Sequence, residues 1–403
     1  MLSYNEALKI INQNFKFLNR EVIEIDLLDS VNHILAEDVY SDINMPPFNN
    51  SAVDGYGILY DDNIREWKLI GEESAGNYKD YTVDKNTTVS IMTGGQVPES
   101  CTSIIPLEDV DVFDDNVKLK DGIIIRDGMN IRKLGENLRA GELAAVRNTM
   151  ITVHKISLLA ACGKSKVKVY KPLKIGVLST GDELVEISEK PSGDKIRATN
   201  LYSIIALLKK FNFEAVNFGF VNDDRNKIKS KVKAMLESDI DVLFTTGGVS
   251  VGKYDYLKDI FEELEVERKF WRAYIKPGKP LYFGLYKDSD KAKLVFGLAG
   301  NPVSSFVNFY VYFIPAFEEN YGVTLTEKIN ARLKNKITKK DGKRHFVRGL
   351  LSYNSQNNFY EVNSAGSQSS GNMVGLSNAD CLIVIDEDKR IAEIGDFVEC
   401  IRL

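Results

Sequence analysis

The chain has 403 residues, 44% hydrophobic and 27% charged, which is typical of a globular protein of about two to four domains. Its formal net charge is −5 and its basic residues are dispersed, which argues against a nucleic-acid-binding protein. Four separated cysteines and three scattered histidines fit neither a disulfide framework nor a zinc site. The N-terminus is unlike a signal peptide, and the most apolar stretch, 303–317, is too short to span a bilayer. We therefore expect a soluble, cytoplasmic protein with no membrane or nucleic-acid partner.

The first 171 residues predict helices on both sides of a β-rich region. Ser3 and Glu6 form a capping box for an N-terminal helix, and 152–163 has helical spacing. Short strands and turns between 58 and 142 predict an all-β module, which we expect to be inserted into a helical and extended domain. The expected N-terminal domain comprises 1–21, 41–48 and 143–171, and the expected inserted module comprises 22–40 and 49–142.

A loop rich in proline, asparagine and glycine covers 45–57 and contains Asp54. This aspartate either closes an Asx-turn or is a carboxylate held rigidly at a site. A second turn begins at Thr93, between two short strands of the predicted module.

From 172 to 324, strands and helices alternate, which predicts a parallel sheet with helices on both faces. The predicted strands cover 173–178, 215–221, 241–244, 270–275 and 293–298, and 303–317 predicts a core helix. The last part, 325–403, predicts a small β-barrel or sandwich. Its polar loop, 364–371, is either a mobile hairpin or a lid over a neighbouring site.

The glycine-rich stretch 245–252 lies between a predicted strand and a predicted helix. This arrangement presents backbone N–H groups and a positive helix end to an anion. A tight connection that merely needs glycine would explain the same residues.

Polar residues follow the predicted strands of this region, and the carboxyl ends of parallel strands share one edge of a sheet. These residues are Asp182, Glu183, Asp223, Asp224, Ser250, Asp255, Lys276, Lys279 and Asn301. Lysines and glycine amides suit an anion, and carboxylates suit Mg²⁺, which prefers one or two carboxylates with phosphate oxygens and water. The residues alone therefore predict Mg²⁺-dependent chemistry on a phosphorylated small molecule.

Seven motifs, in this order and spacing, carry a resemblance to a known family. They begin at Pro47, Ile91, Asn130, Ser179, Thr246, Lys276 and Gly300 and read PFNNSAVDGY, IMTG, NIR, STGDEL, TGGVSVG, KPGKP and GNPVS. Across nearly its whole length the chain resembles the MoeA-type molybdopterin molybdenumtransferases and is similar to the E domain of gephyrin.

The resemblance implies a multidomain α/β protein whose central three-layer domain, 172–324, is like MoaB and MogA. An N-terminal dimerisation domain, the inserted β module and a C-terminal β-barrel, 325–403, would surround it. The implied activity is Mg²⁺-dependent insertion of molybdate into adenylyl-molybdopterin with release of AMP. The implied assembly is a homodimer whose subunits share each active site, and a molybdopterin adenylyltransferase could hand over the substrate.

The resemblance also carries functional roles onto residues of this chain. The catalytic candidates are Asp54, Glu183, Asp255, Lys276 and Lys279. The metal candidates are Asp54, Glu183, Asp223, Asp224 and Asp255. The substrate-binding candidates are Thr93, Thr180, Gly181, Asp182, Asn200, Gly247, Gly248, Ser250, Gly252, Arg272, Pro302, Ser304, Arg348 and Ser369, with Arg344 a weaker one.

Three positions depart from the family pattern. Asn137 stands where an acid is usual, Ala198 where aspartate is common, and Ala299 where proline is common. The first two bear on the ligation of Mg²⁺ or substrate, and the departures are compatible with a tungsten preference or with a paralogue of weaker activity. Two other functions are compatible with parts of the pattern: a molybdopterin adenylyltransferase, which would resemble the central domain alone, and a scaffold that only binds molybdopterin.

Overall fold

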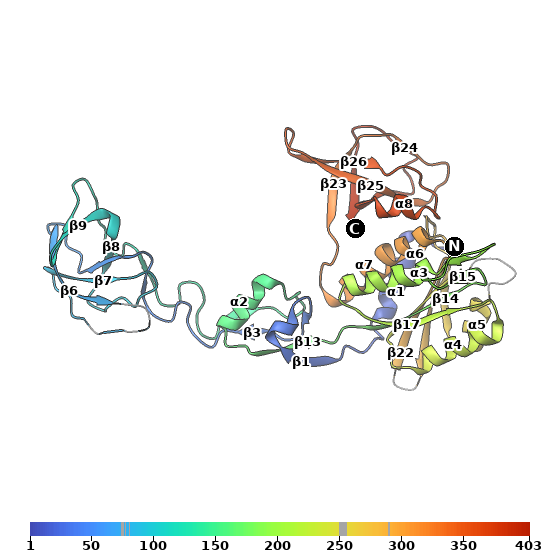
Figure 1. Cartoon of the computed structure of the whole chain (residues 1–403), viewed down its shortest axis with the longest axis horizontal. Coiled ribbons are helices and arrows are strands. Elements are labelled where there is room, and N and C mark those ends of the chain that lie inside the picture. The colour runs from blue at the N-terminus through green and yellow to red at the C-terminus, as the bar shows by residue number, and fades with distance from the viewer. Residues whose placement is uncertain (74–75, 77, 80, 250–255, 289–290) are drawn as a thin grey trace.

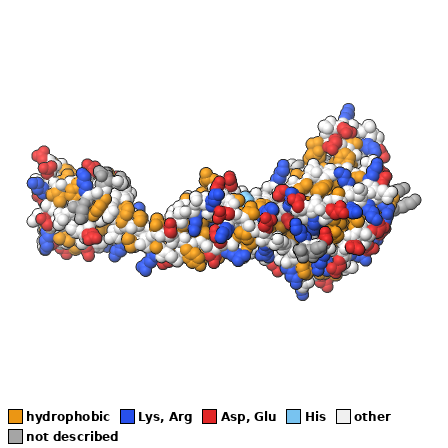
Figure 2. Space-filling model, turned by 90° about the horizontal axis from the view of Figure 1, so that it is seen from below, with side chains coloured by type: hydrophobic (Ala, Val, Ile, Leu, Met, Phe, Trp, Pro, Cys, Tyr) orange, Lys and Arg blue, Asp and Glu red, His pale blue; other side chains and the backbone are white. Residues whose placement is uncertain are grey.

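The computed structural model describes residues 1–73, 76, 78–79, 81–249, 256–288 and 291–403. Figure 1 shows three bodies in a row: a distal β module, a small middle module, and a main body that contains the α/β domain and the C-terminal barrel. Figure 2 shows acidic and basic side chains intermingled over the visible face of all three. Within the described ranges, no helix is long and apolar enough to cross a membrane.

The distal module is a six-stranded sheet in the order β8-β5-β7-β6-β10-β9, which confirms the predicted all-β insertion. In the strand 66–73, successive side chains point to opposite faces of the sheet, so Trp67 is 1% exposed while its neighbours Glu66 and Lys68 face water. The elements are β5 (Gly55–Ile58), β6 (Glu66–Glu73), β7 (Thr87–Ile91), β8 (Ser103–Pro106), η2 (Leu107–Asp109), β9 (Val110–Phe113) and β10 (Asn116–Leu119).

Two antiparallel chain crossings, 41–49 and 133–142, join the distal and middle modules, and we call them the neck (Figure 1). In the neck the Met45 backbone N–H donates to the Leu138 carbonyl at 2.7 Å, and the Leu138 N–H donates to the Met45 carbonyl at 3.2 Å. Asn137, one of the departures from the family pattern, donates its backbone N–H to the Met45 carbonyl in this neck. At its distal end, β4 (Asn50–Ser51) pairs with β11 (Ile131–Arg132).

The expected assignment of 22–40 to the inserted module is wrong, because this segment lies in the middle module. β1 pairs antiparallel with β13 along its full length, and β2 pairs with the other side of β13, so this segment does not belong to the inserted module. The reason is that apolar side chains of 22–40 and 143–170 cover one another in a single small core. The elements are β1 (Val22–Asp26), η1 (Leu27–Ser30), β2 (Ile34–Leu35), β3 (Val39–Tyr40), β12 (Leu143–Ala145), α2 (Val153–Ala161) and β13 (Lys166–Tyr170).

The α/β domain has a six-stranded sheet in the order β17-β14-β18-β22-β21-β19. The first four strands are parallel, as predicted, whereas β21 runs antiparallel to β22 and to β19. The predicted parallel sheet is therefore mixed, because 281–288 forms a strand that returns through a short connection into β22. The strands are β14 (Lys174–Thr180), β15 (Leu184–Val185), β16 (Ile196–Arg197), β17 (Glu214–Val221), β18 (Val242–Thr246), β19 (Glu267–Trp271), β20 (Ile275–Lys276), β21 (Leu281–Asp288) and β22 (Lys291–Leu298).

Helices cover both faces of this sheet. One face packs on α3 and on a continuous apolar segment made of α6, the π-helical η3 and α7, which confirms the predicted core helix. The N-terminal helix α1 packs on this face too, so residues 4–15 belong to the main body. The other face packs on α4 and α5. The helices are α1 (Tyr4–Phe15), α3 (Thr199–Lys210), α4 (Arg225–Glu237), α5 (Leu257–Glu263), α6 (Pro302–Asn308), η3 (Phe309–Phe313) and α7 (Ile314–Tyr321).

The C-terminal region is a closed barrel, because β25 pairs with β26 on one side and with β27 on the other. β20 of the α/β domain pairs with the start of β25 and thereby joins the two domains. The barrel strands are β23 (Lys328–Leu333), β25 (Arg344–Asn354), β26 (Phe359–Ser364), β27 (Cys381–Ile385) and β29 (Phe397–Arg402), with the small elements β24 (Ile337–Thr338), β28 (Ile391–Ala392) and α8 (Met373–Ser377).

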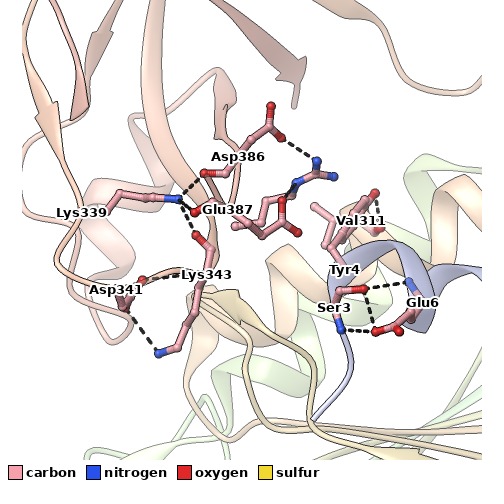
Figure 3. A network of polar contacts seen from close by, with 10 residues as sticks. Ser3, Tyr4, Glu6, Val311, Lys339, Asp341, Lys343, Asp386 and Glu387 are labelled. Atoms are coloured by element: carbon pink, nitrogen blue, oxygen red, sulfur yellow. Dashed lines mark hydrogen bonds and ion pairs between the residues drawn. The ribbon is translucent and has the colours of Figure 1, made fainter. Parts of the chain in front are cut away.

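A polar network reinforces this junction (Figure 3). The ammonium group of Lys339, whose residue is 4% exposed, donates to the Lys343 carbonyl at 2.6 Å and to the carbonyls of Asp386 and Glu387. Arg344 pairs with the carboxylates of Asp386 and Glu387, and its guanidinium lies 4.5 Å from the ring centre of Tyr4 in α1. Arg344 is thus committed to the domain junction rather than to a substrate.

Phe313 is the residue that we expect to contribute most to the core of the main body. Its ring contacts those of Phe15, Phe213, Phe244 and Phe296, so it joins two helices to the sheet. Phe313→Ala should cost about 3 to 5 kcal/mol, the usual range for deleting a buried phenylalanine. Hydrogen exchange of the β18 and β22 amides would measure this loss. Phe113→Ala, at a 68% exposed position, is the control and should change stability by less than about 0.5 kcal/mol.

Candidate functional site

A cavity of about 900 Å³ lies at the carboxyl edge of the α/β sheet. β14 has β17 on one side and β18 on the other. The chain that follows β14 runs to β17, whereas the chain that follows β18 runs toward the opposite side of the sheet, so a crevice forms between these two strand ends. Predicted site residues that line the cavity are Thr180, Gly181, Glu183, Asn200, Asp223, Gly247, Gly248 and Pro302. The sheet therefore brings together eight candidates that are dispersed over 123 residues of sequence.

The glycine turn after β18 forms one wall and requires glycine at both positions. Gly247 and Gly248 have φ angles of +92° and +64°, in the left-handed region. A Cβ on Gly247 would lie 2.5 Å from the carbonyl oxygen of Thr180. The Thr180 residue is 4% exposed, and its buried hydroxyl has no hydrogen-bond partner within the described part of the chain. This wall therefore brings the backbone of the glycine turn close to the cavity, where it can approach an anionic ligand.

Two carboxylates, those of Glu183 and Asp223, belong to residues that line the same cavity. The Glu183 carboxylate folds back over Gly181, where a Cβ would meet its oxygens at 2.5 and 2.6 Å. Asp182 holds the loop instead, since its carboxylate accepts the Asp223 backbone N–H at 3.0 Å. One oxygen of the Asp224 carboxylate caps α4 by accepting from the backbone N–H groups of Asn226 and Lys227, and Asp224 does not line the cavity, so its metal role stays a prediction.

Two cations that sequence reasoning missed, Lys195 and Arg197, also line the cavity. The Lys195 ammonium donates to the Asp182 carbonyl at 2.7 Å, and the Arg197 Nε donates to the Ile187 carbonyl at 2.8 Å. Their position at β16, just before the start of α3, was the sequence signal that could have indicated an anion-binding role. The Asn200 side chain fastens the start of α3 to the next turn by donating to the Gly300 carbonyl at 2.6 Å. Ala198 is 1% exposed at this point, whereas a longer polar residue would have to be accommodated there.

Lys276 and Lys279 lie in the connection from β19 to β21. β19 runs in the same direction as β22, so this connection reaches the same edge of the sheet as the cavity. Both lysines are exposed and neither lines the cavity, although the adjacent Pro280 does. Arg272, at the end of β19, is likewise outside the lining and places its guanidinium over the ring of Trp271.

Asp54 and Thr93 come together in the distal module, far from this cavity (Figure 1). The Asp54 carboxylate accepts the Thr93 backbone N–H at 2.6 Å and the Thr93 hydroxyl at 2.7 Å. These two hydrogen bonds, the backbone one first, hold the pKa of Asp54 below its ordinary value. Asp54 is therefore a carboxylate kept ionised and oriented by Thr93, and its role at a site stays a prediction. Within one chain it cannot reach Glu183.

Arg348 differs from its expected substrate-binding role. It is 1% exposed, and its guanidinium donates to the carbonyls of Ser367, Ser369 and Asn372. It therefore positions the loop 366–372, whose Ser370 carbonyl accepts the Val303 backbone N–H. Gly371 and Met373 of this region line the cavity, so the loop lies against the site as one of the two readings of the polar loop proposed.

The remaining candidates do not add to the cavity. Ser304 is 4% exposed inside the first turn of α6 and is outside the lining. Ser250, Gly252 and Asp255 lie outside the described residues. Among the residues that are described, no group of three or more histidine, cysteine, aspartate or glutamate side chains is placed to hold a metal ion.

Replacing Arg348 tests whether it organises the cavity wall. Arg348→Met removes the donors to the loop carbonyls while keeping a long apolar stem. Amides of 366–372 should then exchange hydrogen at least about tenfold faster, equivalent to about 1.4 kcal/mol of local stability. Mass spectrometry after pulse labelling would measure this. Arg402→Met, at a half-exposed barrel arginine paired with Glu327, should leave these amides unchanged.

Comparison with known proteins assigns three regions that cover most of the chain. Residues 2–163 match the "MoeA N-terminal region (domain I and II)", 176–319 the "Probable molybdopterin binding domain" and 330–403 the "MoeA C-terminal region (domain IV)". The molybdopterin molybdenumtransferase of Haemophilus influenzae is 33% identical over 379 residues, covering 93% of this chain and 92% of that protein. That of Staphylococcus aureus is 30% identical and covers 98% and 93%.

A solved structure agrees over the full length. The molybdopterin biosynthesis MoeA protein of Pyrococcus horikoshii superposes with a TM-score of 0.83 at 26% identity and covers all of both chains. The chain therefore belongs to the MoeA family of molybdopterin molybdenumtransferases.

Proposed function

We propose that this protein inserts molybdate into adenylylated molybdopterin, in a reaction that cleaves the phosphoanhydride and releases AMP. The observation that carries the proposal is the cavity at the sheet edge, which gathers a glycine turn, two carboxylates and two cations around about 900 Å³. Adenylylated molybdopterin carries two phosphates and molybdate is a dianion, so both need cations and N–H donors. The named relatives are molybdopterin molybdenumtransferases, which supports molybdopterin as the substrate class.

Glu183 and Asp223 fit the donor set of a magnesium ion. They are hard oxygen donors among the residues that line the cavity, and Mg²⁺ takes one or two carboxylates and completes its shell with phosphate oxygens and water. When bound there, the ion would neutralise charge on the phosphoanhydride. Lys195 and Arg197 would bind the phosphate oxygens, and the 247–248 turn would orient the substrate beside them.

We further infer that two subunits share each site. Asp54 is ionised and oriented by Thr93 but lies in the distal module, out of reach of the cavity of its own chain. A second chain that places its distal module against the cavity would add this carboxylate to Glu183 and Asp223. A homodimer is the simplest assembly that does so. Location in the cytoplasm and delivery of substrate by an adenylyltransferase stay predictions.

The central test is AMP release from adenylylated molybdopterin. Release should depend on both molybdate and Mg²⁺, and Glu183→Gln should lower its rate by about a hundredfold because charge stabilisation at the phosphoryl group is lost. Glu189→Gln, an exposed glutamate that does not line the cavity, is the matched control and should behave as wild type. Adenylylation of molybdopterin by ATP without molybdate would instead show an adenylyltransferase. Binding of molybdopterin without AMP release would show a scaffold.

Subunit mixing tests the shared site. Chains carrying Asp54→Asn and chains carrying Glu183→Gln should each be inactive as homodimers. Co-expression of the two should restore about a quarter of wild-type activity, because half of the dimers are mixed and each mixed dimer has one intact site. An inactive mixed preparation, shown by mass spectrometry to contain mixed dimers, would place all of the catalytic residues within one chain.

A further inference from the structure

Trp271, at the end of β19, connects the cavity wall to the edge of the sheet. Its indole N–H donates to the Val249 carbonyl at 2.9 Å. Val249 follows the glycine turn directly, lines the cavity and is 2% exposed. Its side chain packs against Gly297 in β22, where a Cβ would lie 2.6 Å from a Val249 methyl group. The indole therefore fixes the main chain of a residue that is itself locked into the cavity wall.

Two cationic side chains lie over the ring of the same tryptophan. The Arg272 guanidinium carbon lies 3.9 Å from the ring centre, which is a close cation–π contact, and the Lys258 ammonium lies 5.1 Å from it. Arg272 has a φ angle of +79°, a left-handed conformation that is unfavourable for a non-glycine residue. Its backbone N–H donates to the Leu281 carbonyl at 2.9 Å, and its own carbonyl accepts from Leu2.

The left-handed backbone of Arg272 helps to set the direction of its side chain. Residues held in sparsely populated conformations persist only where their surroundings over-determine them, and they cluster at functional sites. Here two backbone hydrogen bonds fix the peptide and the indole fixes the guanidinium. The indole of Trp271 thus links the positive charge of Arg272 to Val249, which lines the cavity.

We propose that Trp271 is a positioning residue that couples the glycine turn of the cavity wall to Arg272, a cation just outside the cavity lining, so that the turn and this charge keep a fixed relation to an anionic substrate. This inference rests on the proposed function, because it takes the ligand of the cavity to be phosphorylated. The indole N–H sets the wall through Val249, and the indole ring sets the cation. Trp271 itself need not touch the substrate.

Fluorescence provides a direct test of the coupling. The chain has two tryptophans, and Trp67 lies in the distal core, where its indole nitrogen has no partner among the described residues. In a Trp67→Phe protein, emission reports Trp271 alone. Titration with molybdopterin should shift or quench this emission saturably, since ligand contact with the turn changes the Val249 carbonyl and the Arg272 contact. Saturable binding by equilibrium dialysis without any emission change would overturn the proposal.

Kinetics separate positioning from packing. Trp271→Phe keeps a ring for Arg272 but removes the N–H, so KM for adenylylated molybdopterin should rise about fivefold with kcat within about twofold. Trp271→Leu also removes the ring and should raise KM further. In an Arg272→Gln background it should add only the roughly fivefold effect of losing the N–H, the same as Trp271→Phe, because the ring no longer has its cation to hold. A lower melting temperature with unchanged KM, or additive effects of Trp271→Leu and Arg272→Gln, would show that Trp271 only packs.

The two proposals fail differently. If the wild-type protein releases no AMP in the presence of molybdate and Mg²⁺, the proposed reaction is wrong. The fluorescence titration with molybdopterin still decides whether Trp271 couples the turn to Arg272, because it requires binding and no turnover. If AMP release is normal and the tryptophan variants match wild type in KM, the positioning inference alone is overturned.

Discussion

The site depends on the register of three neighbouring parallel strands. Ser179 of β14 is aligned with Thr246 of β18, and Thr246 is aligned with Leu298 of β22. The turns that follow these strands therefore open at one level along one edge. A hydrogen bond of 2.7 Å between the hydroxyls of Ser179 and Thr246 lies at this level and is buried. A slip of one residue in either pair would separate the glycine turn from Glu183.

Much of the fold could be predicted because its signals are local. Alternating strands and helices predict the α/β domain, and glycine and carboxylate residues that follow strands predict the cavity edge. The assignment of 22–40 was wrong because the partner of β1 is β13, 140 to 148 positions away in sequence, and no local pattern encodes that pairing. The antiparallel β21 was missed for a different reason, since β21 and β22 are adjacent in the chain and the prediction placed no strand at 281–288.

Individual side chains were harder to predict than the edge that carries them. Arg348 is charged and was a substrate-binding candidate, yet its guanidinium donates to loop carbonyls, which only the folded barrel reveals. Asp224 looks like its neighbour Asp223 in sequence, but one residue further along the chain the carboxylate reaches the backbone of α4. Lys195 and Arg197 enter the cavity because β16 pairs with β15, a two-residue contact without a sequence signature.

The neck has a mechanical consequence. Two chain segments held side by side by a few backbone hydrogen bonds form a thin connection, and an isolated two-stranded ribbon is marginally stable at best. A change in the backbone angles of the neck would move Asp54 and Thr93 together, because two hydrogen bonds join them within the distal module. The three bodies lie in a row (Figure 1), so bending at the neck, and not twisting about the row, would change where the distal module can present this carboxylate.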